Sequence, residues 1–343
     1  MYLCRGNLYR YSFHLGFACA PYFRSIQIPY IYSRNSEARV MNRSTVRNFQ
    51  VIIAAIFVFT VLLLSCEKVV HISLASTPPQ VVVDGAIETN IPPYVILTST
   101  IGFFSNIDLS TLQNSFLHGA EISVSCGAKS VNLVEYSFDT GNNNKFYVYT
   151  VDTTNLSNIM LGQVDSFYTL TIKYGGQIYT SVTKIPNPKG IDTMWFATPT
   201  YQDSKTPKGA LQLFVNYTDP DTPGNCVRYF TQLNGGPYYP SQIFSDEVVN
   251  GKTVKDIGLF AGYAQTIDAN GDSLSYFYAG DTVTLKWCEI DQGVYNFWNT
   301  AGYAASAIGN PFASPINLQS NMTNGALGVW AGYGSTFKTA VVP

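Results

Sequence analysis

The sequence predicts an all-β protein, with an immunoglobulin-like β-sandwich at residues 80–186 and a second β-rich domain with one short helix at 190–343. Two observations predict this class. From Val81 onward, apolar residues recur with a period of two, which is typical of half-buried strands. Turn-forming residues divide the stretch before residue 186 into about seven short runs, a spacing typical of a β-sandwich.

The first domain is expected to consist of short strands bounded by Gly, Pro, Ser or Asn. These strands are expected at residues 81–87, 94–98, 120–124, 131–134 and 145–150. A hairpin follows, because alternating runs at 167–174 and 177–183 flank Gly175-Gly176. Both glycines tolerate a positive φ, so the pair predicts a two-residue turn.

The segment Pro186-Asn187-Pro188-Lys189-Gly190 interrupts the alternation and predicts the domain boundary. Strands are expected beyond it at residues 211–217, 226–232 and 282–288, and the glycine-spaced apolar run at 325–334 predicts a tightly packed or bulged final strand. One stretch departs from the β pattern. Residues 291–305 carry apolar side chains on one helical stripe, with Asp291 placed as the N-cap. The stripe consists of Val294, Phe297, Trp298 and Ala301.

An uncharged apolar run at residues 51–65 indicates that the protein is exported. It is too short for a typical membrane-spanning helix, and Arg43 and Arg47 precede it, as in a secretory signal. Its ending, Leu63-Leu64-Ser65-Cys66, resembles a bacterial lipoprotein signal, in which the cysteine is lipidated and becomes the first mature residue. A plain membrane anchor or a core strand is the alternative interpretation.

The segments around this run follow from that interpretation. Residues 41–65 are expected to be the lipoprotein signal peptide, and 1–40 an upstream extension that is not part of the native protein. A genuine long n-region of the signal is the alternative for residues 1–40. Residues 66–79 are polar and contain prolines, so they are expected to form a tether.

The charge of the chain after the signal excludes some partners. From Cys66 onward there are 13 basic and 21 acidic residues, and Arg228 is the single arginine. A chain this acidic lacks the basic patch that nucleic-acid binding requires. Attachment to a membrane must therefore come from the lipid.

Residues for nucleophilic catalysis are scarce. After the signal, histidine occurs only at His71, in the tether, and His118, at a strand entrance. A catalytic triad needs a histidine held against a nucleophile, and the sequence has no Gly-x-Ser-x-Gly motif. Cys226 and Cys288 are expected as small buried residues; a disulfide between them is the alternative.

Two short acidic loops are candidate calcium sites. One contains Asp219 and Asp221, and the other contains Asp268, Asn270 and Asp272. Calcium prefers six to eight oxygen ligands. The alternative for both loops is an ordinary turn, which Asp, Asn and Gly favour for backbone reasons.

Three residues are candidates for ligand binding. Arg228 would clamp a ligand carboxylate, or it would pair with Asp219 or Asp221, which is the more common role for such a residue. Tyr238 and Tyr239 are expected at a turn tip that leaves their rings exposed, where they would bind sugars or apolar peptides.

A series of short motifs follows one another along the chain: Cys66-Glu67-Lys68, residues 82–85, 119–124 and 168–172, Asp219-Pro220 with Asn225 and Arg228, and residues 280–283, 295–298 and 325–334. Their order resembles family 4249 of the domains of unknown function, which are outer-membrane lipoproteins of the Bacteroidota. The resemblance implies a lipid-anchored, two-part β protein, often encoded near TonB-dependent receptors, and no reaction. Cys226 departs from the family, which more often has an aromatic residue there, so no disulfide is implied.

These observations favour a non-enzymatic, lipid-anchored accessory protein of the outer membrane, without a cofactor other than the lipid on Cys66. It is expected to bind a TonB-dependent receptor or to capture a nutrient. The alternatives are a carbohydrate-binding lipoprotein, which would use Tyr238 and Tyr239, and a hydrolase with a pair of acids.

Overall fold

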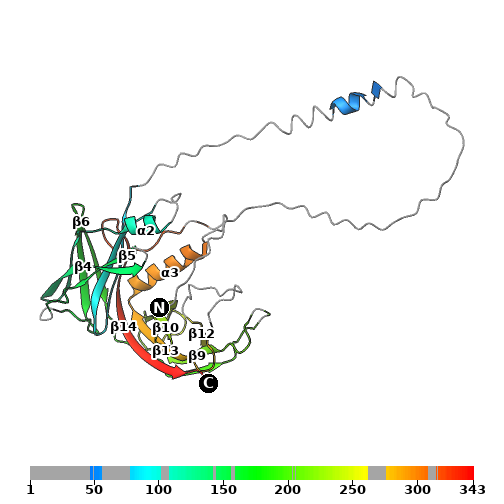
Figure 1. Ribbon diagram of the computed structural model, residues 1–343. Helices are drawn as coiled ribbons and strands as arrows, with labels where there is room; N and C mark the ends of the chain where they lie inside the picture. Colours follow the sequence, from blue (N-terminus) through cyan, green and yellow to red (C-terminus); the bar gives the residue numbers. More distant parts are fainter. Residues whose placement is uncertain are drawn as a thin grey trace. The chain divides into compact units, whose positions relative to one another are not determined.

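An eleven-stranded sheet and a three-stranded sheet make up most of the described chain (Figure 1). The computed structural model describes residues 47–48, 50–55, 78–101, 108–141, 144–155, 159–202, 204, 206–261, 276–307, 314 and 316–343. The elements are β1 (Val81–Glu88), β2 (Ile91–Ser99), α2 (Leu109–Ser115), β3 (Glu121–Cys126), β4 (Lys129–Gly141), β5 (Asn144–Val151), β6 (Phe167–Tyr174), β7 (Gln177–Lys184), β8 (Thr193–Ala197), β9 (Gln212–Thr218), β10 (Cys226–Leu233), β11 (Tyr238–Ser245), β12 (Thr253–Leu259), β13 (Thr282–Ile290), α3 (Gln292–Ala307) and β14 (Leu327–Val341).

The long strand β14 lies between the strands from the first half of the chain and those from the second half. The strand order is β11-β10-β13-β14-β1-β2-β5-β4-β3-β6-β7. β14 pairs antiparallel with β13 and parallel with β1, where Val82 lies opposite Leu327 and Glu88 opposite Tyr333. Strands from both expected domains, 80–186 and 190–343, therefore share one sheet. Leu74–Pro343 forms one compact unit, and the boundary expected at 186–190 lies within it.

Glycines allow β14 to approach its neighbours at distances that a side chain would prevent. A Cβ atom on Gly328 would lie 1.8 Å from the carbonyl oxygen of Val83, and one on Gly332 would lie 2.2 Å from that of Lys184. The tight final strand expected from the glycine spacing is confirmed. Its packing also brings β7, at the far end of the sheet order, against β14, so this part of the sheet curls around its own core.

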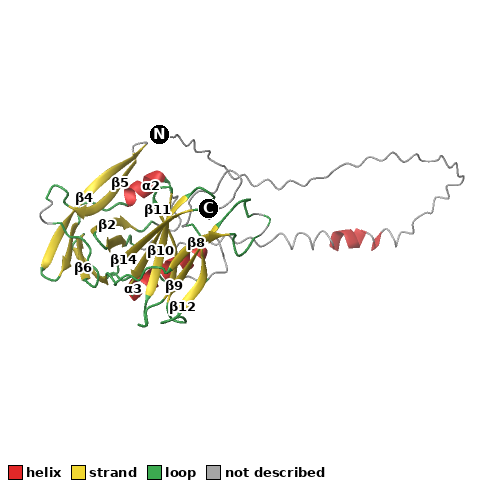
Figure 2. Ribbon diagram, turned by 90° about the horizontal axis from the view of Figure 1, so that it is seen from below, coloured by secondary structure: helices red, strands yellow, loops and turns green. Residues whose placement is uncertain are grey.

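Buried apolar side chains occupy both faces of the sheet. One cluster fills the curled part, where Val95, Leu170 and Trp330 are fully buried. A second lies between the small sheet, ordered β12-β9-β8, and β10 and β13, with Tyr229 and Trp287 at its centre. In a strand, successive side chains point to opposite faces. The remaining face of β10, β13, β14 and β1 is therefore free for α3 (Figure 2).

The cap of α3 also fastens the helix to the first half of the chain. One carboxylate oxygen of Asp291 accepts the N–H of Val294 at 2.9 Å, as expected for an N-cap. The other accepts the Thr183 hydroxyl at 2.6 Å and the Lys184 N–H at 3.1 Å. Val294 and Phe297 are buried under the helix, which confirms the expected helix and its apolar stripe.

The predicted all-β class is confirmed, and so is the hairpin at Gly175-Gly176. β6 and β7 pair from Phe167–Lys184 to Tyr174–Gln177, and the two glycines have φ angles of 58° and 76°. Among the described residues, none of the helices has the length and apolar character needed to cross a bilayer. Cys66, most of the expected signal peptide and most of the tether lie outside the described residues.

The close approach of β14 predicts a large effect of one methyl group. Gly332→Ala should lower the free energy of unfolding by roughly 3 kcal/mol or more, because its Cβ would overlap the Lys184 carbonyl. The matched control is Gly302→Ala in α3, where a Cβ meets nothing within 4 Å and alanine favours the helix by about 1 kcal/mol. Urea denaturation measures both. Equal stability of the two variants would contradict the close approach.

Candidate functional site

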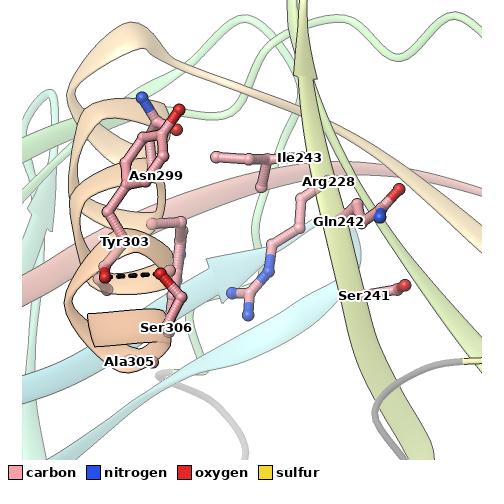
Figure 3. A pocket seen from close by; sticks show the side chains of 11 residues that line it. Arg228, Ser241, Gln242, Ile243, Asn299, Tyr303, Ala305 and Ser306 are labelled. Atoms are coloured by element: carbon pink, nitrogen blue, oxygen red, sulfur yellow. Dashed lines mark hydrogen bonds between the residues drawn. The ribbon is translucent and has the colours of Figure 1, made fainter. Parts of the chain in front are cut away.

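A cavity of about 690 Å³ lies between α3 and the strands β10 and β11 (Figure 3). It is within the size range of sites that bind small ligands. Its lining residues are Arg228 of β10, Ser241, Gln242 and Ile243 of β11, and Trp298, Asn299, Ala301, Gly302, Tyr303, Ala305 and Ser306 of α3. Most of the α3 side chains facing it are small, so the helix leaves space beside the strands.

The alternation of β10 directs Arg228 to this cavity. Its neighbours Val227 and Tyr229 pack into the core toward the small sheet, so Arg228 points to the opposite face, beneath α3. The side chain is 7% exposed. A guanidinium is charged at any ordinary pH, and burying it is costly unless it is paired.

Aromatic groups surround the guanidinium. Its Cζ atom lies 3.5 Å from the centroid of the Trp298 ring and 5.0 Å from that of Phe230. Nη1 donates a hydrogen bond of 3.0 Å to the hydroxyl of Tyr333, while Nε is buried without a partner. Burial raises the pKa of Tyr333, so this acceptor is a neutral phenol. These contacts hold the guanidinium in place by aromatic rings and a phenol, and not by a hydrogen-bonded carboxylate of the described residues.

The part of the chain that the structure describes contains no salt bridge between Arg228 and an acid. Arg228 acts on Asp84 of β1 at longer range: desolvation raises the pKa of Asp84, and the guanidinium lowers it in part. The expected pairing with Asp219 or Asp221 is wrong. Asp219 accepts the Gly251 N–H at 3.2 Å on the small-sheet side of β10, the face opposite to Arg228.

A buried ion pair lies next to this site. Lys286 of β13 donates to the carboxylate of Glu88, and both side chains are largely buried. The centroid of the Phe230 ring lies near both cations, 4.9 Å from Lys286 Nζ and 5.0 Å from Arg228 Cζ. Glu88 is therefore already paired with lysine, and Arg228 is the basic residue that lines the cavity.

The two tyrosines expected at a turn tip begin strand β11 instead. The turn ends before them, and Tyr239 pairs with Thr231 of β10. Consecutive strand residues point to opposite faces, so Tyr238 and Tyr239 do not form one platform. The Tyr238 ring packs edge-on against Phe337, and each tyrosine is over a third exposed.

Two acids of the second half line another cavity, of about 290 Å³, on the opposite side of β10. Asp219 and Asp246 line it and are both buried. Asp246 accepts the N–H groups of Gly224 and Asn225, at 2.7 and 2.9 Å. These bonds hold the loop before β10 in place, which is the structural role expected of a turn aspartate.

The candidate calcium loops are described only in part. Asp268, Asn270 and Asp272 lie outside the described residues. Within the described residues, no group of three or more His, Cys, Asp or Glu side chains is placed to hold a metal ion. Asp221 is exposed.

The cysteines and the histidine of the described chain have structural surroundings. Cys226 and Cys288 are buried free thiols, which agrees with the expectation of small buried residues. The Cys288 thiol lies 3.2 Å from the Ser335 hydroxyl. His118 pairs with Glu135, whose other oxygen accepts the Tyr149 hydroxyl at 3.0 Å.

A model of the family described as a domain of unknown function, DUF4249, matches residues 67–339. The chain belongs to this DUF4249 family. The match covers the whole cavity, including Arg228 and Trp298, and begins one residue after Cys66. No curated protein matches the chain.

In the described part of this DUF4249 chain, Arg228 is thus a buried basic group that lines a cavity, and only part of this site could be predicted from the sequence. Arg228 was identified as a candidate from its isolation. Trp298 was recognised only as part of the helix stripe, and Ser241, Gln242 and Ile243 were not singled out. The available signal was the spacing of Arg228 and Phe230, which places a cation and an aromatic ring on the same face of a strand.

Titration of Glu289 should make stability depend on pH. Burial raises the pKa of this β13 carboxyl to about 7, opposed by the Tyr217 hydroxyl, which donates to it at 2.7 Å. Because the pKa is raised in the folded state, the stabilisation is present below the unfolded value and is lost as pH rises through about 7. Between pH 5 and 8, the wild type should lose on the order of 2 kcal/mol relative to Glu289→Gln.

Thermal or urea denaturation at several pH values measures this difference. The exposed Glu247→Gln is the control, and its stability should follow that of the wild type at each pH. Parallel pH curves for the wild type and Glu289→Gln would contradict the raised pKa.

Proposed function

We propose that this is a non-enzymatic, lipid-anchored binding protein of the outer membrane that captures a small ligand bearing a carboxylate. The ligand binds in the cavity between α3 and β10–β11. The main support for this proposal is the environment of Arg228. This residue is 7% exposed, it lines the cavity, and it makes no salt bridge to an acid among the described residues.

The surroundings of the guanidinium favour a planar anion. The Trp298 ring centroid lies 3.5 Å from the Cζ atom of the guanidinium, and the Phe230 ring centroid lies 5.0 Å from it. Nη1 keeps one N–H beyond its bond to Tyr333, and Nη2 keeps two, so these groups remain for a ligand, whereas Nε is buried. A carboxylate matches these groups with two parallel hydrogen bonds, which supports a carboxylate as the bound group.

The anchor is proposed from the sequence before the folded unit. An apolar run at residues 51–65 ends at Cys66, and a polar segment with prolines then leads to β1. A lipid on Cys66 would keep the cavity close to the membrane. A TonB-dependent receptor is the proposed partner to which the captured ligand passes.

The two alternative functions have less support. Carbohydrate binding through Tyr238 and Tyr239 would need both rings on one surface, and they occupy successive strand positions. A hydrolase would need one acid free to donate a proton and one free to attack. Asp219 and Asp246 line one cavity, but both accept backbone N–H groups that hold loops.

The binding proposal predicts that affinity for carboxylates depends on Arg228. Calorimetric titration of the full chain with hexanoate and benzoate should detect binding, and the matching amides should bind at least tenfold more weakly. Arg228→Met should lower carboxylate affinity at least tenfold, because a charge-assisted bidentate contact contributes over 1.4 kcal/mol. Arg228→Lys should give an intermediate loss.

The control for this test is Lys255→Met, which removes the same charge at an exposed position. Its affinity should stay within twofold of the wild type. Thermal melting should show that Arg228→Met folds, since methionine buries a similar volume without the charge. Equal carboxylate affinity in folded Arg228→Met and wild type would refute the assignment.

The anchor predicts a covalent lipid at one residue. When the chain is expressed with its signal in a Gram-negative host, mass spectrometry should find an acylated N-terminal Cys66. Cys66→Ala should remain uncleaved and unacylated, while Cys126→Ala should behave as the wild type. A mature protein that keeps residues upstream of Cys66 would rule out the lipoprotein interpretation.

A further inference from the structure

Strand β11 is an edge of the large sheet. Within the described residues, β11 is hydrogen-bonded to one strand, β10. The other side of β11 pairs with no backbone group of these residues. An open edge presents unpaired N–H and C=O groups, and proteins normally cover or interrupt such edges. Pro240 interrupts the first half of β11, because proline has no N–H, but residues 241–245 contain no proline.

The register shows which groups face outward. The Asp246 N–H donates to the Asn225 carbonyl at 3.1 Å. Bonded and non-bonded pairs alternate along an antiparallel ladder. The pair Val227–Phe244 is then hydrogen-bonded, and the pair Arg228–Ile243 is not. The N–H and C=O of Ile243 therefore point away from β10, to the open edge.

The open edge borders the cavity that contains Arg228. Ser241, Gln242 and Ile243 all line it, although successive side chains of a strand point to opposite faces. The alternation is broken at this point, so three successive residues of this edge strand reach the same cavity. The ladder is also irregular between Arg228 and Phe230, which places a bulge in β11 at this point. Bulges often redirect a strand beside a binding site.

Helix α3 forms the opposite wall. Ala301, Gly302 and Ala305 line the cavity with little or no side chain, so the helix surface is set back from β11. Figure 3 shows the Arg228 guanidinium in the space between α3 and the strand that carries Ser241 and Ile243. A groove between an edge strand and a helix, with a cation inside, combines two modes of peptide recognition: strand addition and capture of a carboxylate.

We infer that the ligand is a peptide that binds in an extended conformation along the Ile243 edge of β11, with its C-terminal carboxylate at Arg228. This inference rests on the proposed function and names its ligand class. Hydrogen bonds to the peptide backbone supply affinity independent of sequence. The carboxylate supplies the preference for a free end, and the small residues of α3 leave room for varied side chains.

The test uses a pool of N-acetylated tetrapeptides with randomised side chains and a free carboxyl group. The full chain should retain members of this pool and should not retain the same pool as carboxamides. Calorimetry should show that retained peptides bind at least tenfold more tightly than N-acetylalanine, which has the carboxylate but little backbone. Methylation of the backbone nitrogen that meets the β11 edge should weaken binding at least tenfold.

A protein variant tests the edge directly. Ile243→Pro removes one outward N–H and no bond of the β10–β11 ladder, so it should weaken peptide binding at least tenfold more than it weakens N-acetylalanine binding. Ile243→Val keeps the N–H and should change the affinities for peptide and N-acetylalanine by the same factor. The exposed Lys255→Met, which lies outside the cavity lining, should leave both affinities unchanged. If Ile243→Pro does not fold, the N-methyl series in the wild type decides the same question.

The outcomes separate this inference from the proposed function. Peptides that bind no better than N-acetylalanine, or an N-methyl series without effect, would overturn the peptide inference and leave carboxylate capture standing. If neither peptides nor simple carboxylates bind in a way that depends on Arg228, the proposed function is overturned as well.

Discussion

The close contact of β14 with β1 and with the end of β7 is the constraint on which the rest of the structure depends. Gly328 and Gly332 allow backbone atoms to approach at distances that any side chain would block. The strand then supplies Trp330 to the core of the curled part, Tyr333 to Arg228, and a full ladder to β13. Without this strand, the halves of the sheet would have no shared backbone hydrogen bonds.

The cavity is a product of that arrangement. β14 carries the Tyr333 hydroxyl that accepts from Arg228, and Asp291 fastens the start of α3 to β7, so the helix extends over the strands at a fixed position. The charge of Arg228 is supported by a ring and a phenol rather than by a carboxylate. Such a group lowers stability relative to an apolar residue, and natural proteins keep costs of this kind mainly at functional sites.

Local features of the fold could be predicted from the sequence, and long-range features could not. The Gly175-Gly176 hairpin, the Asp291 cap and the stripe of α3 depend on residues close together in the chain, and all three were found in the structure. The parallel pairing of β1 with β14 depends on residues about 245 positions apart, for which alternation gives no signal. For the site, the isolation of Arg228 was visible, but its partners were assigned by proximity in sequence. Because side chains alternate between the faces of β10, Arg228 lies on the face opposite to Asp219.

The β1–β14 ladder also bears on how the chain reaches its native state. Contacts between distant residues slow folding, because a long loop must close before they form. Here the first strand of the folded unit can pair with β2 at once, but it cannot gain its second partner until Leu327–Val341 has been synthesised. An emerging chain would therefore expose the edge of β1, with its run of valines, for most of translation. Such an edge is a natural substrate for chaperones that bind extended segments and delay its pairing with other chains.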